Sequence, residues 1–371
     1  GGDARDWPHD RLPLAGIAPS RCYRGRQGNW ALYVDRLMRD MGTTDLVLFG
    51  DCRPMHMVAH QMARLRAVRV HVFEEGYVRP HWMSLERDGV NGRSRFVRDP
   101  AALLAAGATA PSLPQGLPPV TASAARRRRD TFRYYAAVAL GLPRFPFFRS
   151  HRPGSLAAEG LGWLRKFARS RSAARAAERT IAGLVPGSYF LFPLQLCSDY
   201  QIRVHSPFAQ MDQAVDYVLA SFAAHAPADA MLVIKEHPLD ASWRRWSARI
   251  ARRARRMGLS SRVAHVAGGN LEELARNSRG VVVVNSTAAT FALAAGVPVK
   301  TLGTAIYAVD GIVHPGPLDT FWSAPEPPDA ALYEAMLRAL HAECLVRGGI
   351  ASQSAVRLLV ENAAARLLAD P

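Results

Sequence analysis

The polar segment Asn285, Ser286 and Thr287 is the clearest place for chemistry in this sequence, because it directly follows a run of four valines. The valines predict a buried strand, and the small polar residues predict a turn that opens a helix. Backbone N–H groups and the helix dipole at such a turn favour binding of a phosphate. An ordinary helix N-cap formed by the same residues is the alternative.

A second polar segment holds Lys235, Glu236, His237 and Pro238, at the end of the predicted strand 231–235. Lys235 supplies a cation and His237 an imidazole, and both could face the phosphate or the ribose of a nucleotide. His237 could instead cap a turn. Two polar strand ends within one half of the chain favour a nucleotide site.

Two acidic residues, Glu74 and Glu75, follow the predicted strand 68–73. Successive side chains of a strand point to opposite faces, so we expect only one of these carboxylates to face a given cleft. Two close carboxylates would raise the pKa of one of them and prepare it for proton transfer. Ion pairs with Arg79 or Arg53 are the structural alternative.

A further carboxylate, Asp199, follows the predicted strand 189–194 and is suited to act as a nucleophile or an electrostatic stabiliser. An Asx turn is the structural alternative. The other polar side chains of these strand-end segments are candidates for binding the donor (Gln195) and for contacting an acceptor or a sugar (Asp51, Arg53, His56, Arg79, Gln201 and His205).

Alternating strands and helices are expected to position these segments. The first series has strands at 45–49 and 68–73 around a helix at 55–65. The second series has strands at 189–194, 231–235, 263–266, 281–284 and 299–302, and helices at 209–224, 242–257, 271–277 and 288–295. This order predicts parallel sheets covered by helices, in which ligands gather at the carboxyl ends of the strands. Residues 100–120 lose periodicity and predict a loop, whereas 330–343 and 353–368 predict helices.

The chain of 371 residues is too long for one compact core, so two domains are expected. Its four cysteines are scattered without a Cys-x-x-Cys pair, which argues against a disulfide framework or a zinc site. No run approaches the roughly 20 apolar residues that span a bilayer, and the N-terminal residues lack the pattern of a signal peptide. We therefore expect a cytoplasmic protein.

Positive charge is concentrated in one part of the chain. The formal net charge is +16, and residues 121–180 hold 14 Lys or Arg against three acidic residues. Aromatic side chains lie among these cations, a mixture suited to an anionic membrane surface. Nucleic acid is an alternative anionic partner, and a solvated arginine-rich helix with a mobile loop is the structural alternative.

Taken in order, these segments resemble the capsular polysaccharide biosynthesis and export family. The most specific matches are residues 73–80 (FEEGYVRP) with 89–92 (GVNG), and residues 194–206 (LQLCSDYQIRVHS). The Lys-x-His-Pro and Asn-Ser-Thr elements are less specific singly. The resemblance implies a GT-B-like α/β architecture, in which two Rossmann-type parallel-sheet domains face a central cleft and helices end the chain.

The resemblance also implies a reaction. Members of the family transfer Kdo (3-deoxy-D-manno-octulosonic acid) from CMP-Kdo with retention, and they begin the linker that joins the capsule to a phospholipid. By this likeness Asp199 is the nucleophile of a double displacement, and Glu74 or Glu75 assists deprotonation of the acceptor, with Glu74 favoured. The expected contacts of the CMP-sugar donor are Lys235, His237, Pro238, Gln195, Asn285, Ser286 and Thr287.

The chain is most similar to single-domain members that place the first Kdo on lysophosphatidylglycerol, because one catalytic unit fills it. This implies CMP-Kdo and an anionic phospholipid acceptor as substrates, and a peripheral position at the inner face of the inner membrane. Contact with the capsule assembly or export machinery is also implied. No nucleic-acid partner, cofactor or metal is expected.

The expected organisation is an acceptor-side domain over 1–180 with a basic and aromatic insertion at about 121–180, a CMP-sugar-binding domain over 181–330, and helices over 331–371 that could pack back on the first domain. Two other functions stay open. One is a non-catalytic lipid-binding component of the capsule export complex. The other is a GT-B transferase that uses another nucleotide sugar, such as CMP-sialic acid or a UDP-sugar.

Overall fold

The computed structural model describes residues 22–79, 81–148, 156–196, 199–240 and 245–369, apart from the side chains of 124 and 156–159. The motif residues Pro80, Cys197 and Ser198 and the start of the predicted helix 242–257 lie outside this set. The chain divides into two compact units. Unit 1 comprises Gly1–Arg95, Pro114–Pro153 and Glu343–Pro371, and unit 2 comprises Phe96–Leu113 and Gly154–Ala342.

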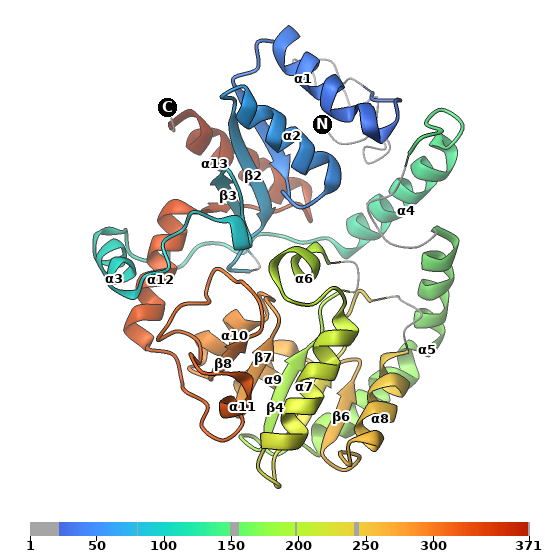
Figure 1. Ribbon diagram of the computed structural model, residues 1–371, viewed down its shortest axis with the longest axis vertical. Coiled ribbons are helices and arrows are strands. Elements are labelled where there is room, and N and C mark those ends of the chain that lie inside the picture. Colours follow the sequence, from blue (N-terminus) through green and yellow to red (C-terminus); the bar gives the residue numbers. More distant parts are fainter. Residues whose placement is uncertain (1–21, 80, 149–155, 197–198, 241–244, 370–371) are drawn as a thin grey trace. The chain divides into compact units, whose positions relative to one another are not determined.

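Unit 1 is built on a four-stranded sheet in the order β1-β2-β3-β9 (Figure 1). β1 (Asp45–Phe49) and β2 (Arg69–Glu75) are parallel, as the sequence predicts. β3 (Trp82–Arg87) runs antiparallel to β2, and β9 (Leu345–Arg347) runs antiparallel to β3. The sheet is therefore mixed, because the connection 76–81 is too short for the crossover of about a dozen residues that a parallel neighbour needs.

Two groups of helices cover the two faces of this sheet. α1 (Trp30–Asp40) and α2 (Pro54–Leu65) pack on one face, where Val70 and Val72 of β2 are buried. α13 (Gln353–Ala369) packs on the other face, where Phe73 contacts a cluster that includes Met83 and Leu359. The C-terminal strand and helix thus belong to unit 1.

The helix α3 (Pro100–Thr109) occupies half of the segment that the sequence predicts as a loop, and that prediction is wrong there. Asp99 caps this helix by accepting a hydrogen bond from the Ala102 N–H at 2.8 Å. Gly107 lies against α12 (Ala330–Glu343), where an added Cβ would come within 2.5 Å of the Ala335 Cα. The alanine-rich sequence favours a helix without an amphipathic pattern, so periodicity missed it.

Unit 2 is built on a five-stranded parallel sheet in the order β6-β5-β4-β7-β8 (Figure 1). Its strands are β4 (Tyr189–Pro193), β5 (Met231–Lys235), β6 (Val263–Val266), β7 (Gly280–Val283) and β8 (Val299–Thr301). Every residue of β4 is buried, as expected for a central strand with helices on both faces. The α/β class that the sequence predicts is confirmed.

The other helices of unit 2 are α5 (Leu156–Ala182), α6 (Tyr200–His205), α7 (Met211–His225), α8 (Trp246–Arg256), α9 (Leu271–Arg276), α10 (Ala289–Ala294) and α11 (Leu318–Phe321). Unit 1 also contains α4 (Ala124–Gly141) and the 3-10 helices η1 (Gln27–Asn29) and η2 (Asn91–Arg93). A buried cluster joins β4 and β5 to α7 and α8. Among the residues that the structure describes, no helix is long and apolar enough to cross a membrane.

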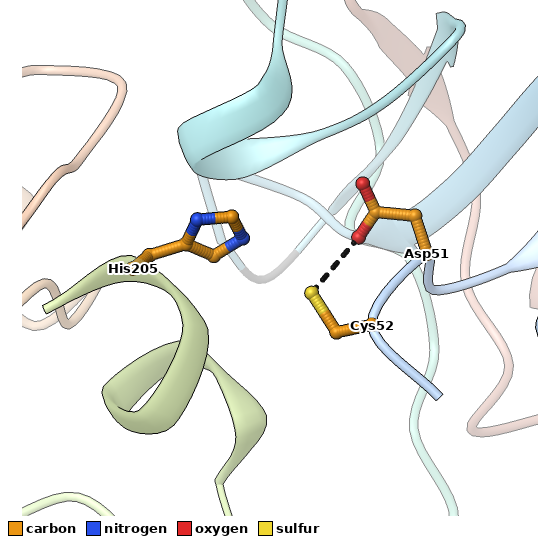
Figure 2. Close-up of side chains that lie close together, drawn as sticks. All are labelled: Asp51, Cys52 and His205. Carbon is orange, nitrogen blue, oxygen red and sulfur yellow. Dashed lines mark hydrogen bonds between the residues drawn. The ribbon is translucent and has the colours of Figure 1, made fainter. Parts of the chain in front are cut away.

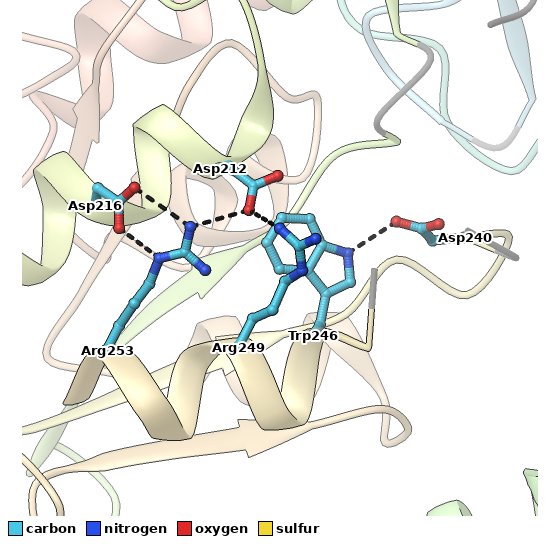
Figure 3. A network of polar contacts seen from close by, with 6 residues as sticks. All are labelled: Asp212, Asp216, Asp240, Trp246, Arg249 and Arg253. Carbon is cyan, nitrogen blue, oxygen red and sulfur yellow. Dashed lines mark hydrogen bonds and ion pairs between the residues drawn. The ribbon is translucent and has the colours of Figure 1, made fainter. Parts of the chain in front are cut away.

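Part of the basic helix α8 serves the fold. Figure 3 shows Arg249 and Arg253 of α8 pointing toward Asp212 and Asp216 of α7. The Asp212 Oδ1 atom lies 2.9 Å from a terminal nitrogen of Arg249 and 3.0 Å from one of Arg253. Arg253 also pairs with Asp216. These ion pairs fasten α8 to α7, so this run of arginines is in part structural.

Candidate active site

The strand order of unit 2 reverses between β4 and β7. From β4 the chain continues to β5 and β6 on one side, and it then returns to β7 and β8 on the other. In open parallel sheets, ligands bind at the carboxyl ends of the two strands that flank such a switch point. Gln195 follows β4 and Asn285 follows β7. Two of the predicted site residues therefore stand at this point.

Three predicted side chains form one hydrogen-bonded network there. Gln195 Nε2 donates to Asn285 Oδ1 at 2.9 Å, and the Asn285 backbone N–H donates to Gln195 Oε1 at 3.2 Å. Gln195 Nε2 also donates to Asp199 Oδ2, over a longer distance of 3.4 Å. Gln195 is only 5% exposed. The amide of Gln195 thus links the ends of β4 and β7 to the Asp199 carboxylate.

Asp199 is the N-cap of α6, and its Oδ1 accepts a hydrogen bond from the Gln201 N–H at 2.9 Å. This is the Asx turn that the sequence offered as an alternative. Asn285 Nδ2 donates to the carbonyl of Gln201 at 2.9 Å and to that of His205 at 3.3 Å. Gln201 and His205, predicted as sugar or acceptor contacts, therefore take part in this network through their backbones.

The predicted donor residue Lys235 ends β5, beside the end of β4. It is buried, and its Nζ donates to the Gly268 carbonyl at 2.8 Å. Burial lowers the pKa of Lys235 below that of an ordinary lysine, and the neighbouring Glu236 carboxylate opposes this shift. The ammonium group is thus held in a fixed place at the carboxyl edge of the sheet.

His237 and Pro238 lie in the turn after β5, where Pro238 is exposed. The Leu239 N–H donates to His237 Nδ1 at 3.1 Å, so a neutral ring carries its proton on Nε2. The ammonium of Lys166, from α5, donates to the Asp240 carbonyl at 2.7 Å. The imidazole of His237 therefore caps a turn, as the sequence allowed.

Ser286 and Thr287 lie half-buried between β7 and α10. Ser286 Oγ accepts a hydrogen bond from the Ala288 N–H at 3.2 Å, and the Thr287 carbonyl accepts one from the Thr290 hydroxyl at 2.8 Å. The Tyr307 hydroxyl donates to the Ser286 carbonyl. The predicted turn between strand and helix is present, and it is held by a tyrosine that no motif of the sequence singled out.

A pocket of about 460 Å³ opens beside this network, and the sequence interpretation did not identify most of its lining. It is lined by Val204, His205, Ser206, Pro207, Thr301, Leu302, Gly303 and Thr304. Gly303 is needed for this shape, because an added Cβ would lie 2.7 Å from the His205 carbonyl oxygen. A glycine directly after a predicted strand was the signal that could have pointed to this segment.

In unit 1, Asp51 follows β1 and is almost completely buried. Figure 2 shows the Cys52 thiol directed at the Asp51 carboxylate, to which it donates at 3.1 Å. The Val90 N–H donates to the other carboxylate oxygen at 3.4 Å, and Arg93 donates to the Asp51 carbonyl at 3.2 Å. Asp51, predicted as a sugar or acceptor contact, thus ties the end of β1 to the segment around Val90.

Two other predicted contacts of unit 1 lie in the turn and helix after β1. His56 is buried and donates from Nδ1 to the Gly50 carbonyl at 2.8 Å, which closes the turn. Arg53 is the N-cap residue of α2 and is half-buried, and its side chain does not bond the helix end. Gly50 adopts a φ of +75°, a conformation that favours glycine.

The two acidic residues at the end of β2 differ in their surroundings. Glu75 is on the Phe73 side of the strand and pairs with Arg79 at 2.9 Å, with both side chains about half exposed. This is the ion pair that the sequence offered as an alternative. Glu74 is on the opposite side, and its Oε2 would be 3.3 Å from a Cβ added at Gly50. Glu74 therefore lies against the turn at the carboxyl end of β1.

The motif residue Tyr77 has a structural task. Its buried hydroxyl donates to the Glu86 carboxylate and accepts a hydrogen bond from the Asn91 N–H at 2.7 Å. Burial and the adjacent Glu86 raise the pKa of Tyr77 well above its ordinary value. This contact joins the two halves of the motif at 73–80 and 89–92. Glu86, which the sequence interpretation did not select, is its acceptor.

The chain matches the sequence family described as capsule polysaccharide biosynthesis protein over residues 44–350. It is 32% identical to the capsule polysaccharide export protein KpsS of Escherichia coli, over 80% of this chain and 77% of that protein. It is 34% identical to the capsule polysaccharide modification protein LipB of Neisseria meningitidis serogroup A, over 78% of this chain and 70% of that protein. Among solved structures it is similar to KpsC of Thermosulfurimonas dismutans, a β-Kdo 2,7 transferase, with a TM-score of 0.45, 15% identity and 90% of each chain covered.

Proposed function

Since this chain belongs to the capsule polysaccharide biosynthesis protein family, we propose that it is a retaining glycosyltransferase that moves Kdo from CMP-Kdo to a phosphatidylglycerol or lysophosphatidylglycerol acceptor. The product would begin the lipid linker of a capsular polysaccharide. The observation that carries this proposal is Asp199, a carboxylate held in a polar network at the switch point of a parallel sheet.

The proposed reaction has two displacements, each at the anomeric carbon. In the first, an Asp199 oxygen bonds to that carbon while the bond to the CMP phosphate oxygen breaks, and CMP leaves. In the second, the acceptor hydroxyl oxygen takes the place of Asp199, and its proton passes to Glu74. Two inversions give net retention.

The donor side of the proposal uses the strand ends of unit 2. Lys235 offers a cation at the end of β5, and His237 offers an imidazole in the following turn. Ser286 and Thr287 offer hydroxyl groups after β7. Cations and hydrogen-bond donors of this kind stabilise a leaving phosphate without a metal ion.

Glu74 is the better of the two acidic residues for proton transfer. The Glu75 carboxylate is already engaged in an ion pair with Arg79. Glu74 lies beside Gly50, in the turn that follows β1. Its position at the carboxyl edge of the unit 1 sheet suits a group that acts on an acceptor.

The acceptor side of the proposal rests on two helices with exposed apolar and basic side chains. On α4, Phe132 is 74% exposed and Leu140 is 83% exposed. On α5, Leu161, Leu164 and Phe167 are each more than half exposed. The exposed cations of α5 are Arg169, Arg171, Arg175 and Arg179. Such faces suit peripheral attachment to an anionic bilayer at the inner face of the inner membrane, where capsule machinery would also be met.

A direct test is incubation of the protein with CMP-Kdo and a fluorescent lysophosphatidylglycerol. We expect a product one Kdo heavier, and a trapped Kdo adduct on Asp199 in the absence of acceptor. Asp199→Ala should abolish transfer and keep CMP binding. Full activity of this variant would disprove the nucleophile, and no product from the unaltered protein would disprove the proposed reaction in favour of a non-catalytic component.

Two further measurements test the substrates. Calorimetric titrations with CMP and UDP should show binding of CMP, and preference for UDP would instead indicate another nucleotide sugar. Flotation with vesicles should show binding to phosphatidylglycerol and little binding to phosphatidylcholine. Equal binding to both vesicles would reject the electrostatic membrane role.

A further inference from the structure

The amide side chains of Gln195 and Asn285 were expected to bind the donor, yet their hydrogen-bonding groups are already in use. A primary amide has two N–H donors. Those of Gln195 go to Asn285 Oδ1 and Asp199 Oδ2, at 2.9 and 3.4 Å. Those of Asn285 go to the carbonyls of Gln201 and His205, at 2.9 and 3.3 Å. Neither amide has a donor left over for a nucleotide.

The two amides hold α6 at both ends. Gln195 contacts Asp199, the residue that caps the start of the helix. Asn285 contacts the carbonyl of His205, the last helical residue. The same carbonyl accepts the Thr304 N–H at 2.8 Å, which adds a link to the segment after β8.

The short helix needs such support. With six residues, α6 is far below the length of about 12 at which an isolated helix becomes marginally stable. Its position therefore depends on contacts with the rest of unit 2. Because Asp199 is the N-cap, any shift of α6 moves the carboxylate as well.

We propose that Gln195 and Asn285 are positioning residues. Together they form an amide clamp that fixes α6 and aims the Asp199 carboxylate at the anomeric carbon, and they do not bind CMP. This inference rests on the proposed function, in which Asp199 is the nucleophile. Since attack requires the reacting atoms to be held near 3 Å, a displacement of about 1 Å costs a factor of about 100 in rate.

The first variant is Gln195→Met, which keeps the length and volume of the side chain and removes its hydrogen bonds. We expect kcat to fall about 100-fold, while the Kd of CMP changes less than about threefold. Asn285→Leu should have an effect of similar size. In the double variant kcat should also be lower by about 100-fold, because each single variant already breaks the same clamp.

Gln213→Met is the matched control. Gln213 Oε1 accepts the Ala209 N–H at 2.7 Å at the start of α7, so the variant loses a structural amide of the same unit. Its kcat should stay near that of the unaltered protein. If Asn285→Leu fails to fold, Gln195→Met and its control decide the question alone.

Hydrogen exchange separates the clamp from the proposed function. The backbone amides of α6 should exchange faster in Gln195→Met than in the unaltered protein, whether or not the protein turns over CMP-Kdo. In Gln213→Met their exchange should not change. No transfer by the unaltered protein would refute the proposed function alone. The clamp would be overturned by a loss of CMP affinity of about tenfold or more with kcat retained, or by unchanged exchange and kcat in Gln195→Met.

Discussion

The carboxyl ends of the strands in the two units are lined with polar residues of similar types, but these residues have different tasks. In unit 2 the strands are all parallel, and the polar side chains after β4 and β7 form one network that includes the Asp199 carboxylate. In unit 1 the sheet is mixed, because β1, β2 and β9 run in one direction and β3 runs in the other. There Asp51 and Tyr77 bind neighbouring loop segments, and Glu74 lies against the turn after β1.

The difference separates strand-end residues that have structural contacts from those that we propose to act in catalysis. Asp51 is buried and accepts hydrogen bonds from Cys52 and Val90, so it stabilises a loop. Glu75 is exposed and paired with Arg79. Burial and partners, which the sequence does not state, thus divide residues that look equivalent in the sequence. The predictions that follow test this division, beginning with the largest expected effect.

Replacing the two glutamates one at a time tests the acceptor side. Glu74→Gln should lower kcat about 1000-fold, since it removes the group that we propose takes the acceptor proton. Glu75→Gln, the matched control, should change kcat by less than about threefold, because an exposed ion pair contributes little. Transfer kinetics with CMP-Kdo and lysophosphatidylglycerol measure both. Equal losses, or a larger loss for Glu75→Gln, would contradict the division between them.

Replacing Lys235 tests the donor side. Lys235→Met should raise the Kd of CMP about 30-fold, which corresponds to about 2 kcal/mol for a charged hydrogen bond. Because the pKa of Lys235 is lowered by burial, its charge is lost earlier as the pH rises, so CMP affinity should begin to fall below the ordinary lysine range. Calorimetric titrations between pH 7 and pH 10 measure both effects.

Lys300→Met is the control for this experiment. Lys300 is also partly buried, and its Nζ donates to the His314 carbonyl at 3.0 Å. In this variant the free energy of unfolding by urea should fall, and the affinity for CMP should not change. A similar loss of CMP affinity in both variants would mean that Lys235 acts only through the stability of unit 2.

The ion pairs between α7 and α8 should affect stability and leave chemistry unchanged. Asp212→Ala should lower the free energy of unfolding by about 2 kcal/mol, because the Asp212 carboxylate is mostly buried and pairs with both Arg249 and Arg253. Asp216→Ala, at a half-exposed position, should cost about 0.5 kcal/mol. Urea unfolding measures the order of the two. Normal transfer kinetics in both variants are expected, and a selective loss of kcat would contradict the structural assignment.

A small, pH-dependent effect on stability is expected at the amino end of β1 in the unit 1 sheet. Hydrogen bonds from Arg69 and His71 hold the pKa of Asp45 far below its usual range. A depressed carboxyl pKa stabilises the fold above the unfolded-state value of about 3.9, and this stabilisation is lost as the pH falls below it. Asp45→Asn should therefore cost about 1 kcal/mol at pH 7 and less at pH 3. Urea unfolding of both proteins measures this loss, and a loss in Asp45→Asn that grows toward acidic pH would contradict the expected sign.

Most strands and helices could be predicted because their signals are local. The strand 231–235 and the helix 330–343 have the bounds that the apolar pattern predicts. α3 was missed because its alanine-rich sequence has helix propensity without amphipathic spacing. β9 was missed because it has only three residues, which are too few to show the alternating pattern of a strand.

The site was predictable in its residue types and not in their contacts. The switch-point network contains Gln195, Asp199 and Asn285, all selected from the sequence. The pocket lining around Gly303 and the Tyr307 hydroxyl were not selected, because their roles depend on segments far apart in the chain.

The α/β class, the strand ends at which polar residues gather, and the family to which the chain belongs follow from local apolar patterns and from the order of motifs in the sequence. The mixed order of the unit 1 sheet and the contact between Gln195 and Asn285 became known from the folded structure alone. The structure also selected the ion pair of Glu75 with Arg79 from the alternatives that the sequence left open. Pairings such as that of Gln195 with Asn285 join residues 90 positions apart, and no local pattern of the sequence encodes them.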